Sequence, residues 1–266
     1  MKTLLLSLKR LLGKNGWFIC KTTPYELVET FIRGVRPLTT NHELIRMGSE
    51  YDGGYLLPND LTGINACFSP GVSNTSDFEV QIADLGIKCY MADYSVEAPP
   101  LNHALFEFER KFLGAENNQI FMTLENWVSR NAPEGNDLLL QMDIEGYEYD
   151  VILNTSSQIL QRFRIIVIEF HDLEHMLDKL GFFLINSTFA KLLQDFEIVH
   201  IHPNNIKKAN RAIYKSSEVP SVIEVTFLRK DRIEISTVTN QFPHKLDRPN
   251  SLHFEDYSLP ACWYQH

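Results

Sequence analysis

The stretch LLLQMDIEG, residues 138–146, is an apolar run that ends abruptly in acidic residues from Asp143 onward. A second stretch, IIVIEFH at residues 165–171, has the same design and ends in Glu169 and His171. A buried parallel strand has this pattern when its carboxyl end opens into a ligand crevice. The two stretches therefore predict an α/β fold with a polar site along one edge of a parallel sheet.

A small-residue turn follows a third apolar strand. Residues 64–68 run into SPGVSN at 69–74, which would let a ligand approach the backbone, and the helix start beyond it favours negative charge. A fourth strand, 87–92, ends at Asp93, 22 residues after Gly71. A doubly wound fold places an acid on a ribose hydroxyl at about this spacing. The turn has one glycine, so a GxGxxG fingerprint is absent.

The remaining chain alternates between strand and helix, which implies a parallel sheet with helices on both faces. The strand 222–228 pairs best as an antiparallel insertion. Further strands are expected at 119–122 and 197–202, and helices at 75–85, 101–113, 124–130, 148–161 and 174–196, the last interrupted at Gly181 and near Asn186.

Three segments together resemble one known family, the FkbM-type class I methyltransferases. They are GSEYDGGY at 48–55, FSPGVSNTSDFE at 68–79 and MDIEGYE at 142–148. The resemblance covers roughly residues 46–229. It implies an α/β, Rossmann-like fold with a mostly parallel seven-stranded sheet, an antiparallel last strand and helices on both faces. It also implies S-adenosylmethionine as the cofactor and a hydroxyl group as the methyl acceptor.

The resemblance puts the cofactor against the small-residue turn and the end of the fourth strand. The residues expected to bind it are Tyr55, Ser69, Pro70, Gly71, Val72, Ser73, Asp93, Tyr94 and Asp143. Pro70 and Ser73 stand where the broader class often has further glycines. The segment YDGGY at 51–55 is either a hairpin turn, since Asp-Gly is a turn signal, or a pair of tyrosines that closes over the cofactor, as the resemblance favours.

Methyl transfer from a sulfonium to oxygen is an in-line displacement, so the protein must align donor and acceptor and remove the hydroxyl proton. Glu169 and His171 are two residues apart in a strand and point to the same side. With Asp143 they are the candidate reacting centre, either as a general base or as ligands of a divalent cation that lowers the pKa of the hydroxyl. Glu169 could instead orient helices, but an unpaired buried carboxylate is costly, which favours function.

Two further acids follow Asp143. Glu145 and Glu148 flank the start of the next helix, where negative charge is stabilising by roughly 0.3–1 kcal/mol. That helical role is as well supported as a catalytic one for Glu145, and better supported for Glu148.

The segment HIHPNN at 200–205 forms a second polar cluster. His200 and His202 face the same side of a strand, and histidines with amides suit a polyhydroxylated acceptor such as a sugar. His200, His202 and Asn204 are therefore predicted to bind substrate, and His202 is a further candidate for the catalytic base. A pair of solvent-facing histidines is the alternative; similar segments in the resembled family favour function.

Composition limits the class of protein. The 266 residues, 44% hydrophobic, can bury one core. A net charge of −9, from 25 basic and 34 acidic side chains, disfavours binding to nucleic acid. The four cysteines are scattered without a CxxC pair, which fits a reducing, cytoplasmic location.

Three regions are expected along the chain: a helical N-terminal cap at 1–45, the methyltransferase domain at 46–236 and an irregular C-terminal wrap at 237–266. Residues 1–14 mix leucines with Lys and Arg and are too short to span a membrane, which takes about 20 apolar residues. An amphipathic helix that packs on its own domain or on a second copy in a homo-oligomer is favoured over peripheral contact with an anionic membrane.

The leading hypothesis is an S-adenosylmethionine-dependent O-methyltransferase that acts on a sugar or glycan precursor. A nicotinamide-dependent oxidoreductase uses a similar sheet, but the missing glycines argue against it. A non-catalytic module that binds a glycan or a partner is the third alternative. The polar residues at the strand ends argue against it, because they indicate that catalytic activity is retained.

Overall fold

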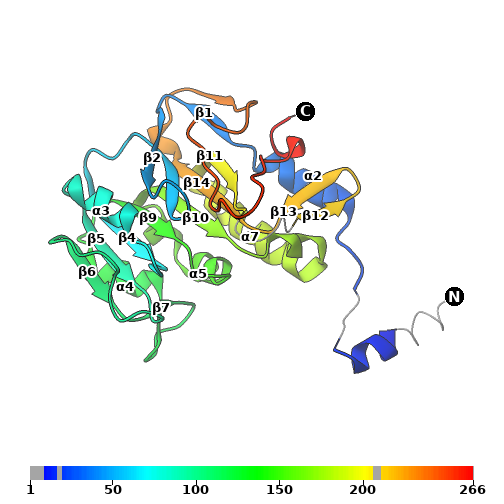
Figure 1. Cartoon of the computed structure of the whole chain (residues 1–266), viewed down its shortest axis with the longest axis horizontal. Helices are drawn as coiled ribbons and strands as arrows, with labels where there is room; N and C mark the ends of the chain where they lie inside the picture. The colour runs from blue at the N-terminus through cyan, green and yellow to red at the C-terminus, as the bar shows by residue number, and fades with distance from the viewer. Residues whose placement is uncertain (1–8, 17–19, 206–210, 266) are drawn as a thin grey trace.

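A computed structural model of the chain describes residues 9–16, 20–205 and 211–265. Its centre is a seven-stranded sheet in the order β11-β14-β10-β9-β4-β5-β6 (Figure 1). The strands are β4 (Ile64–Pro70), β5 (Lys88–Ala92), β6 (Phe106–Glu109), β9 (Asp137–Met142), β10 (Phe163–Phe170), β11 (Phe196–Pro203) and β14 (Ile223–Arg229). β14 is antiparallel to both β10 and β11, and the pairs from β10 to β6 are parallel. The predicted fold class is confirmed.

The central strands are buried on both faces, which explains their continuous apolar runs. Leu138, Leu140 and Met142 of β9 belong to one hydrophobic cluster, and Leu139 belongs to the cluster on the opposite face. Successive side chains of a strand alternate between faces, so only an apolar run can fill both. Each buried leucine contributes about 1.5–3 kcal/mol relative to an exposed one.

Helices cover both faces of the sheet. The buried side chains of α3 join one cluster, and those of the other helices join the cluster on the opposite face. The helices are α2 (Tyr25–Gly34), α3 (Asp77–Asp84), α4 (Leu124–Asn131), α5 (Glu148–Asn154), α6 (Ser157–Leu160) and α7 (Lys179–Asp195), with short 3-10 turns η1 (Leu173–Leu177), η2 (Lys230–Arg232) and η3 (Ala261–Trp263). Thr123 and Asp178 cap α4 and α7 by accepting hydrogen bonds from their first-turn N–H groups.

Within the part of the chain that the structure describes, four small two-stranded sheets surround the centre. The hairpin of β2 (Leu44–Gly48) and β3 (Gly54–Pro58) packs with α3 on one face. The others are β1 (Leu38–Thr40) with β15 (Ser236–Val238), β7 (Phe112–Leu113) with β8 (Phe121–Met122), and β12 (Arg211–Tyr214) with β13 (Ser217–Pro220).

Three expected helices differ from the structure. The helix expected at 101–113 is wrong, because this segment forms β6 and β7; its FEFE run alternates with the period of a strand and pairs with β5. The helix expected at 148–161 is two helices, since Ser156 caps a new start. The breaks expected at Gly181 and near Asn186 are also wrong, because α7 is continuous. Gly181 lies in its first turn, where Asp178 accepts its N–H.

The N-terminal region is helical only in part. Residues 9–14 form a helix with mostly exposed side chains that lies apart from the sheet, and residues 1–8 are outside the described chain (Figure 1). Residues 38–40 and 44–48 are strands, and β1 joins the C-terminal segment through β15. Within the described residues, no helix has the length and apolar character to cross a membrane. The domain limits stay a prediction.

Candidate active site

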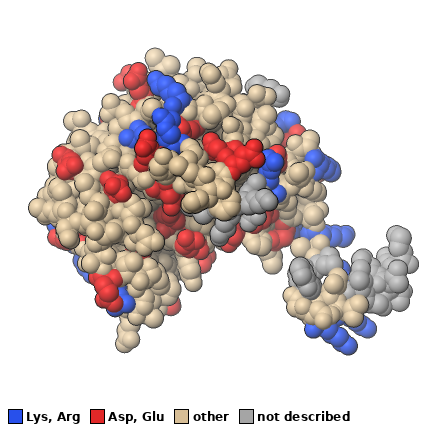
Figure 2. All heavy atoms as spheres, viewed as in Figure 1, with Lys and Arg blue, Asp and Glu red and all other residues tan. Residues whose placement is uncertain are grey.

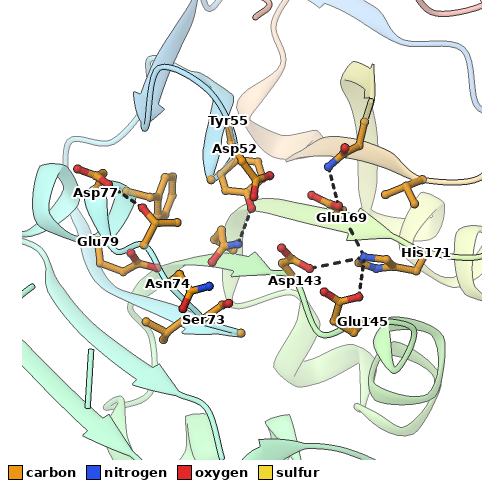
Figure 3. Close-up of a pocket in the computed structure, with 18 of the residues that line it drawn as sticks. Asp52, Tyr55, Ser73, Asn74, Asp77, Glu79, Asp143, Glu145, Glu169 and His171 are labelled. Carbon is orange, nitrogen blue, oxygen red and sulfur yellow. Dashed lines mark hydrogen bonds and ion pairs between the residues drawn. The ribbon is translucent and has the colours of Figure 1, made fainter. Parts of the chain in front are cut away.

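A cavity of about 230 Å³ lies at the carboxyl ends of the central strands, beneath the turn of the β2–β3 hairpin (Figure 3). Of the residues predicted for the site, the cavity brings together Tyr55, Gly71, Val72, Ser73, Asp143, Glu169, His171 and Asn204. Its lining does not include Ser69, Pro70, Asp93, Tyr94, His200 or His202.

The turn after β4 is held by backbone contacts with its neighbours. Gly71 has a φ of +91°, and its N–H donates to Ala92 at 2.9 Å. A Cβ at Gly71 would lie 1.5 Å from the carbonyl oxygen of Asp143. Only glycine fits this position. The sequence suggested a close approach to a ligand here, and the structure adds a close approach to the chain itself.

Asp93 orders this turn from the end of β5. Its Oδ2 accepts from the N–H of Ser73 at 2.9 Å, and its Oδ1 accepts from the N–H of Ser95 at 2.7 Å. The side chain is buried beside the cavity. Its predicted role on the ribose stays a prediction.

A buried polar network lies beneath the turn. The Ser69 hydroxyl contacts Glu79 and lies 2.6 Å from Oε1 of Gln141, whose amide donates to the Tyr55 hydroxyl at 3.2 Å. Burial raises the pKa of Glu79 to about 7. Glu79, Gln141 and Tyr55 line the cavity, so the hairpin and α3 both contribute to its wall.

His171 is surrounded by carboxylates (Figure 3). Its Nε2 lies 3.8 Å from Oδ1 of Asp143, 3.6 Å from Oε2 of Glu145 and 3.6 Å from Oε1 of Glu169. Its Nδ1 lies 3.1 Å from Oε1 of Glu148. The carboxyl ends of β9 and β10 thus bring the predicted trio together, as their neighbouring positions in the sheet require.

Glu148 positions His171 and the backbone after β9. Its side chain is fully buried, and its carboxylate accepts hydrogen bonds from the N–H groups of Ile144 at 3.0 Å and Gly146 at 3.0 Å as well as contacting His171. The sequence favoured a simple role for Glu148 at the helix start. It does begin α5, but the contact with His171 was missed, because it joins residues 23 apart.

Burial and charge perturb the titration of the trio. Burial raises the pKa of Asp143 to about 7 against the opposing charge of His171, and it raises the pKa of Glu169 well above its usual value. Burial alone would lower the pKa of His171, but the hydrogen bond and charge of Glu148, with the charge of Asp143, raise it to about 9. Perturbed groups gathered in a cleft are typical of a reacting centre.

Three buried carboxylate oxygens of the cavity wall have no hydrogen-bond partner among the described residues. They are Oδ1 of Asp143, Oε2 of Glu169 and Oε2 of Glu174. Leaving such an oxygen unpaired costs about 1–3 kcal/mol or more. A ligand that donates hydrogen bonds or carries positive charge would satisfy them.

The histidines of β11 lie away from this centre. Nε2 of His200 lies 2.9 Å from Oδ1 of Asp247, and Nδ1 of His202 lies 3.8 Å from the same atom. His202 pairs across the sheet with Glu224, which pairs in turn with Glu169. Two strand spacings, roughly 10 Å, therefore separate His202 from Glu169. Asn204, by contrast, lines the cavity.

Several acidic residues of the cavity were not singled out in the sequence. The hairpin of 51–55 is present, and Asp52 in its turn faces the cavity while Tyr55 lies on β3. Asp172 and Glu174 follow His171 into η1 and line the same wall. Their position directly after a polar strand end was a usable signal, whereas Asp52 offered only a turn pattern.

Residues 83–196 match the family model described as "Methyltransferase FkbM domain". The match agrees with the resemblance, and the third of the sequence motifs, residues 142–148, lies inside the matched segment. Residues 83–196 are thus similar to an FkbM methyltransferase domain, which supports an S-adenosylmethionine-dependent methyltransferase. No curated protein matches the sequence.

Solved structures to which the chain is similar include two of fibrillarin and one of a precorrin methyltransferase. A fibrillarin/Nop5p complex gives a TM-score of 0.39 at 12% identity, covering 73% of this chain and 98% of that chain. A Methanococcus jannaschii fibrillarin, described as a pre-rRNA processing protein, gives a TM-score of 0.41 at 8% identity, covering 71% and 83%. The precorrin-6y C5,15-methyltransferase of Geobacter metallireducens gives a TM-score of 0.32 at 7% identity, covering 63% and 81%.

Proposed function

We propose that this methyltransferase transfers the methyl group of S-adenosylmethionine to a hydroxyl oxygen of a sugar or glycan precursor. The observation that carries the proposal is His171 among three carboxylates, at 3.6–3.8 Å, in a cavity at the strand ends. A neutral hydroxyl is a weak nucleophile, so its methylation needs a group that takes its proton during transfer. A titratable cluster of this kind suits that task.

The residues of the cavity fit S-adenosylmethionine. Gly71, Val72 and Ser73 offer backbone along the turn after β4, and Tyr55 lies opposite on β3. The cofactor supplies an electrophilic methyl group on a positively charged sulfonium. The negative potential of the cavity acids favours that charge. Asp93 is the proposed partner of the ribose, since its carboxylate lies beside the same turn.

Asp143 is the proposed acceptor of the hydroxyl proton. The pKa of Asp143, raised to about 7 by burial, lies near neutral pH, where a general base is most effective. His171, whose pKa is raised to about 9, is positively charged at neutral pH and stabilises the carboxylate beside it. Asp143 and His171 exchange protons as one coupled pair. His202, the other predicted base, is separated from the cavity by β14.

A divalent cation is the second proposal for the same centre. Asp143, Glu145 and His171 can each offer one ligand atom, and these atoms lie within 4.8 Å of one another. The set differs from the predicted one in that Glu145 replaces Glu169. Glu148 on Nδ1 of His171 would orient the imidazole, as outer carboxylates do for metal-binding histidines. Such a cation would lower the pKa of the acceptor hydroxyl.

The proposal includes a cytoplasmic location and excludes nucleic acid as the acceptor. All four cysteines are free thiols, which supports a reducing compartment. Acidic side chains gather around the hollow on the face shown in Figure 2, which would repel phosphates. A homo-oligomer and membrane contact by residues 1–14 stay predictions.

The function is tested by calorimetric titration with S-adenosylmethionine and with NAD, followed by an assay for S-adenosylhomocysteine release over a panel of sugars. We expect saturable binding of S-adenosylmethionine alone and release that depends on one class of sugar. Binding of NAD in its place would support an oxidoreductase. Cofactor binding with no acceptor-dependent release from any hydroxyl compound would reject O-methyl transfer.

A further inference from the structure

Glu169 has one carboxylate oxygen engaged and one without a partner. Its Oε1 accepts a hydrogen bond from Nδ2 of Asn204 at 2.9 Å. Its Oε2 is buried and has no hydrogen-bond partner among the described residues, although the side chain is only 5% exposed. Glu169 lines the cavity, so a ligand in the cavity can reach this oxygen.

Oε2 of Glu169 is not the oxygen that lies near His171, because Oε1 is the atom 3.6 Å from Nε2 of that histidine. The atoms that cluster closely belong to Asp143, Glu145 and His171. Asn204 fixes the Glu169 carboxylate on the side of the cavity that β11 and β14 border. Glu174, further along the same wall, also has a buried Oε2 without a partner in the described part of the chain. Two unsatisfied acceptors besides Oδ1 of Asp143 thus belong to residues that line the cavity.

The charge of the cavity indicates which kind of donor belongs there. Its wall contains eight acidic side chains, and no described Lys or Arg is part of it. The acids are Asp52, Asp77, Glu79, Asp143, Glu145, Glu169, Asp172 and Glu174. A hydroxyl could satisfy one oxygen but would add no charge to balance the eight acids, which outnumber the one charged histidine of the wall. An ammonium group brings three donors and a positive charge, whereas a carboxylate or phosphate would be repelled.

We infer that Glu169 binds an ammonium group on the methyl acceptor, so that the acceptor is an amine-bearing polyhydroxylated compound such as an amino sugar. This inference rests on the proposed function and deepens it by naming the substrate class. Asn204 positions the carboxylate of Glu169. The amine binds there while a hydroxyl of the same molecule faces Asp143.

The test uses three probes that share a sugar ring: glucosamine, N-acetylglucosamine and glucuronic acid. Each is titrated into the protein with and without saturating S-adenosylhomocysteine, and binding is followed by protein NMR. We expect glucosamine to bind about tenfold or more tightly than N-acetylglucosamine, since a charged hydrogen bond is involved, and glucuronic acid to bind least. The order should hold in the presence of S-adenosylhomocysteine.

Two substitutions test which residue causes the preference for glucosamine over N-acetylglucosamine. Glu169→Gln removes the charge at nearly constant shape, and the ratio of the two affinities should fall to about one. Glu174→Gln, at a less buried position, should reduce it partially. Glu134→Gln is the control, because it removes the same charge from an exposed position before β9 and should leave the ratio unchanged.

Equal affinities for glucosamine and N-acetylglucosamine in the wild-type protein would overturn the inference. So would a preference that survives in Glu169→Gln, or loss of glucosamine binding on addition of S-adenosylhomocysteine, which would assign Oε2 to the cofactor. Loss of Mn²⁺ binding in Glu169→Gln with the amine preference intact would assign it to a metal. The proposed function fails separately, when S-adenosylmethionine itself does not bind.

Discussion

Glu148→Gln is the substitution that most sharply tests how the site is built. The carboxylate of Glu148 accepts from two backbone N–H groups and contacts Nδ1 of His171. Glutamine has nearly the same shape but offers one acceptor oxygen and an NH₂ group. At least one buried donor would then face another donor. A charged hydrogen bond contributes about 1.5–3 kcal/mol, so we expect unfolding to become easier by about 2–3 kcal/mol.

The same change should lower the pKa of His171, because the hydrogen bond and charge of Glu148 are the main causes that raise it. Since the folded pKa of about 9 lies above the ordinary 6.5, this histidine stabilises the fold fully below about pH 6.5, and the contribution is lost as the pH rises through 9. In Glu148→Gln, less stability should be lost as the pH rises toward 9. Turnover should fall about 10–100-fold, the range for outer partners of a site histidine.

The assay combines an NMR titration of the imidazole with urea unfolding at several pH values. Asp150→Asn is the matched control, because it removes an exposed charge from the first turn of the same helix. It should cost about 0.3–1 kcal/mol through the helix dipole and leave the pKa of His171 unchanged. Equal losses of stability in both variants, with an unchanged pKa of His171 in Glu148→Gln, would show that Glu148 does not hold His171 in this way.

Further substitutions test the turn, the ribose contact and the histidines of β11. Gly71→Ala should fail to fold or lose several kcal/mol in thermal unfolding, because its Cβ would lie 1.5 Å from a carbonyl oxygen, whereas Gly135→Ala, also at positive φ but in open space, should lose about 1 kcal/mol. Asp93→Ala should weaken S-adenosylmethionine binding by about 1.5–3 kcal/mol in calorimetry, and unchanged affinity in the folded variant would remove Asp93 from the cofactor site. Burial alone would raise the pKa of Asp247, but His200 and His202 hold this pKa well below its usual range. Ionised Asp247 therefore stabilises the fold above about pH 4, and this contribution is lost as the pH falls further. Unfolding of Asp247→Asn, followed as the pH is lowered, should be less steep than that of the wild type.

The parallel strands could be predicted because each of them can be recognised from one short segment of the sequence. β9 and β10 are buried on both faces, so each is a continuous apolar run, and the polar residue that ends it marks the edge of the sheet. Neighbouring strand ends then bring Asp143 and His171 together. The segment 101–113 gave no such signal, because its aromatic and acidic residues fit the period of a helix as well as that of a strand. Pairing with β5 makes part of it a strand.

Contacts between distant segments could not be predicted. The carboxylate of Glu148 on His171 depends on how α5 begins against β10, and a sequence offers only the helix start. His202 was predicted to bind substrate, and was named as a further candidate base, because paired histidines with amides suit a sugar. The insertion of β14 between β10 and β11 sets it two strands away, and Asp247, from the C-terminal segment, contacts it there.

O-methyl transfer is measured most directly by following a ¹³C-labelled methyl group from S-adenosylmethionine with the wild type and with His171→Ala, and by measuring cofactor affinity on both. We expect a labelled methyl group bonded to oxygen, near-equal cofactor affinities, and turnover lower by about 10²–10⁴ in the variant. A label found on nitrogen or carbon, or wild-type turnover in His171→Ala, would contradict this expectation.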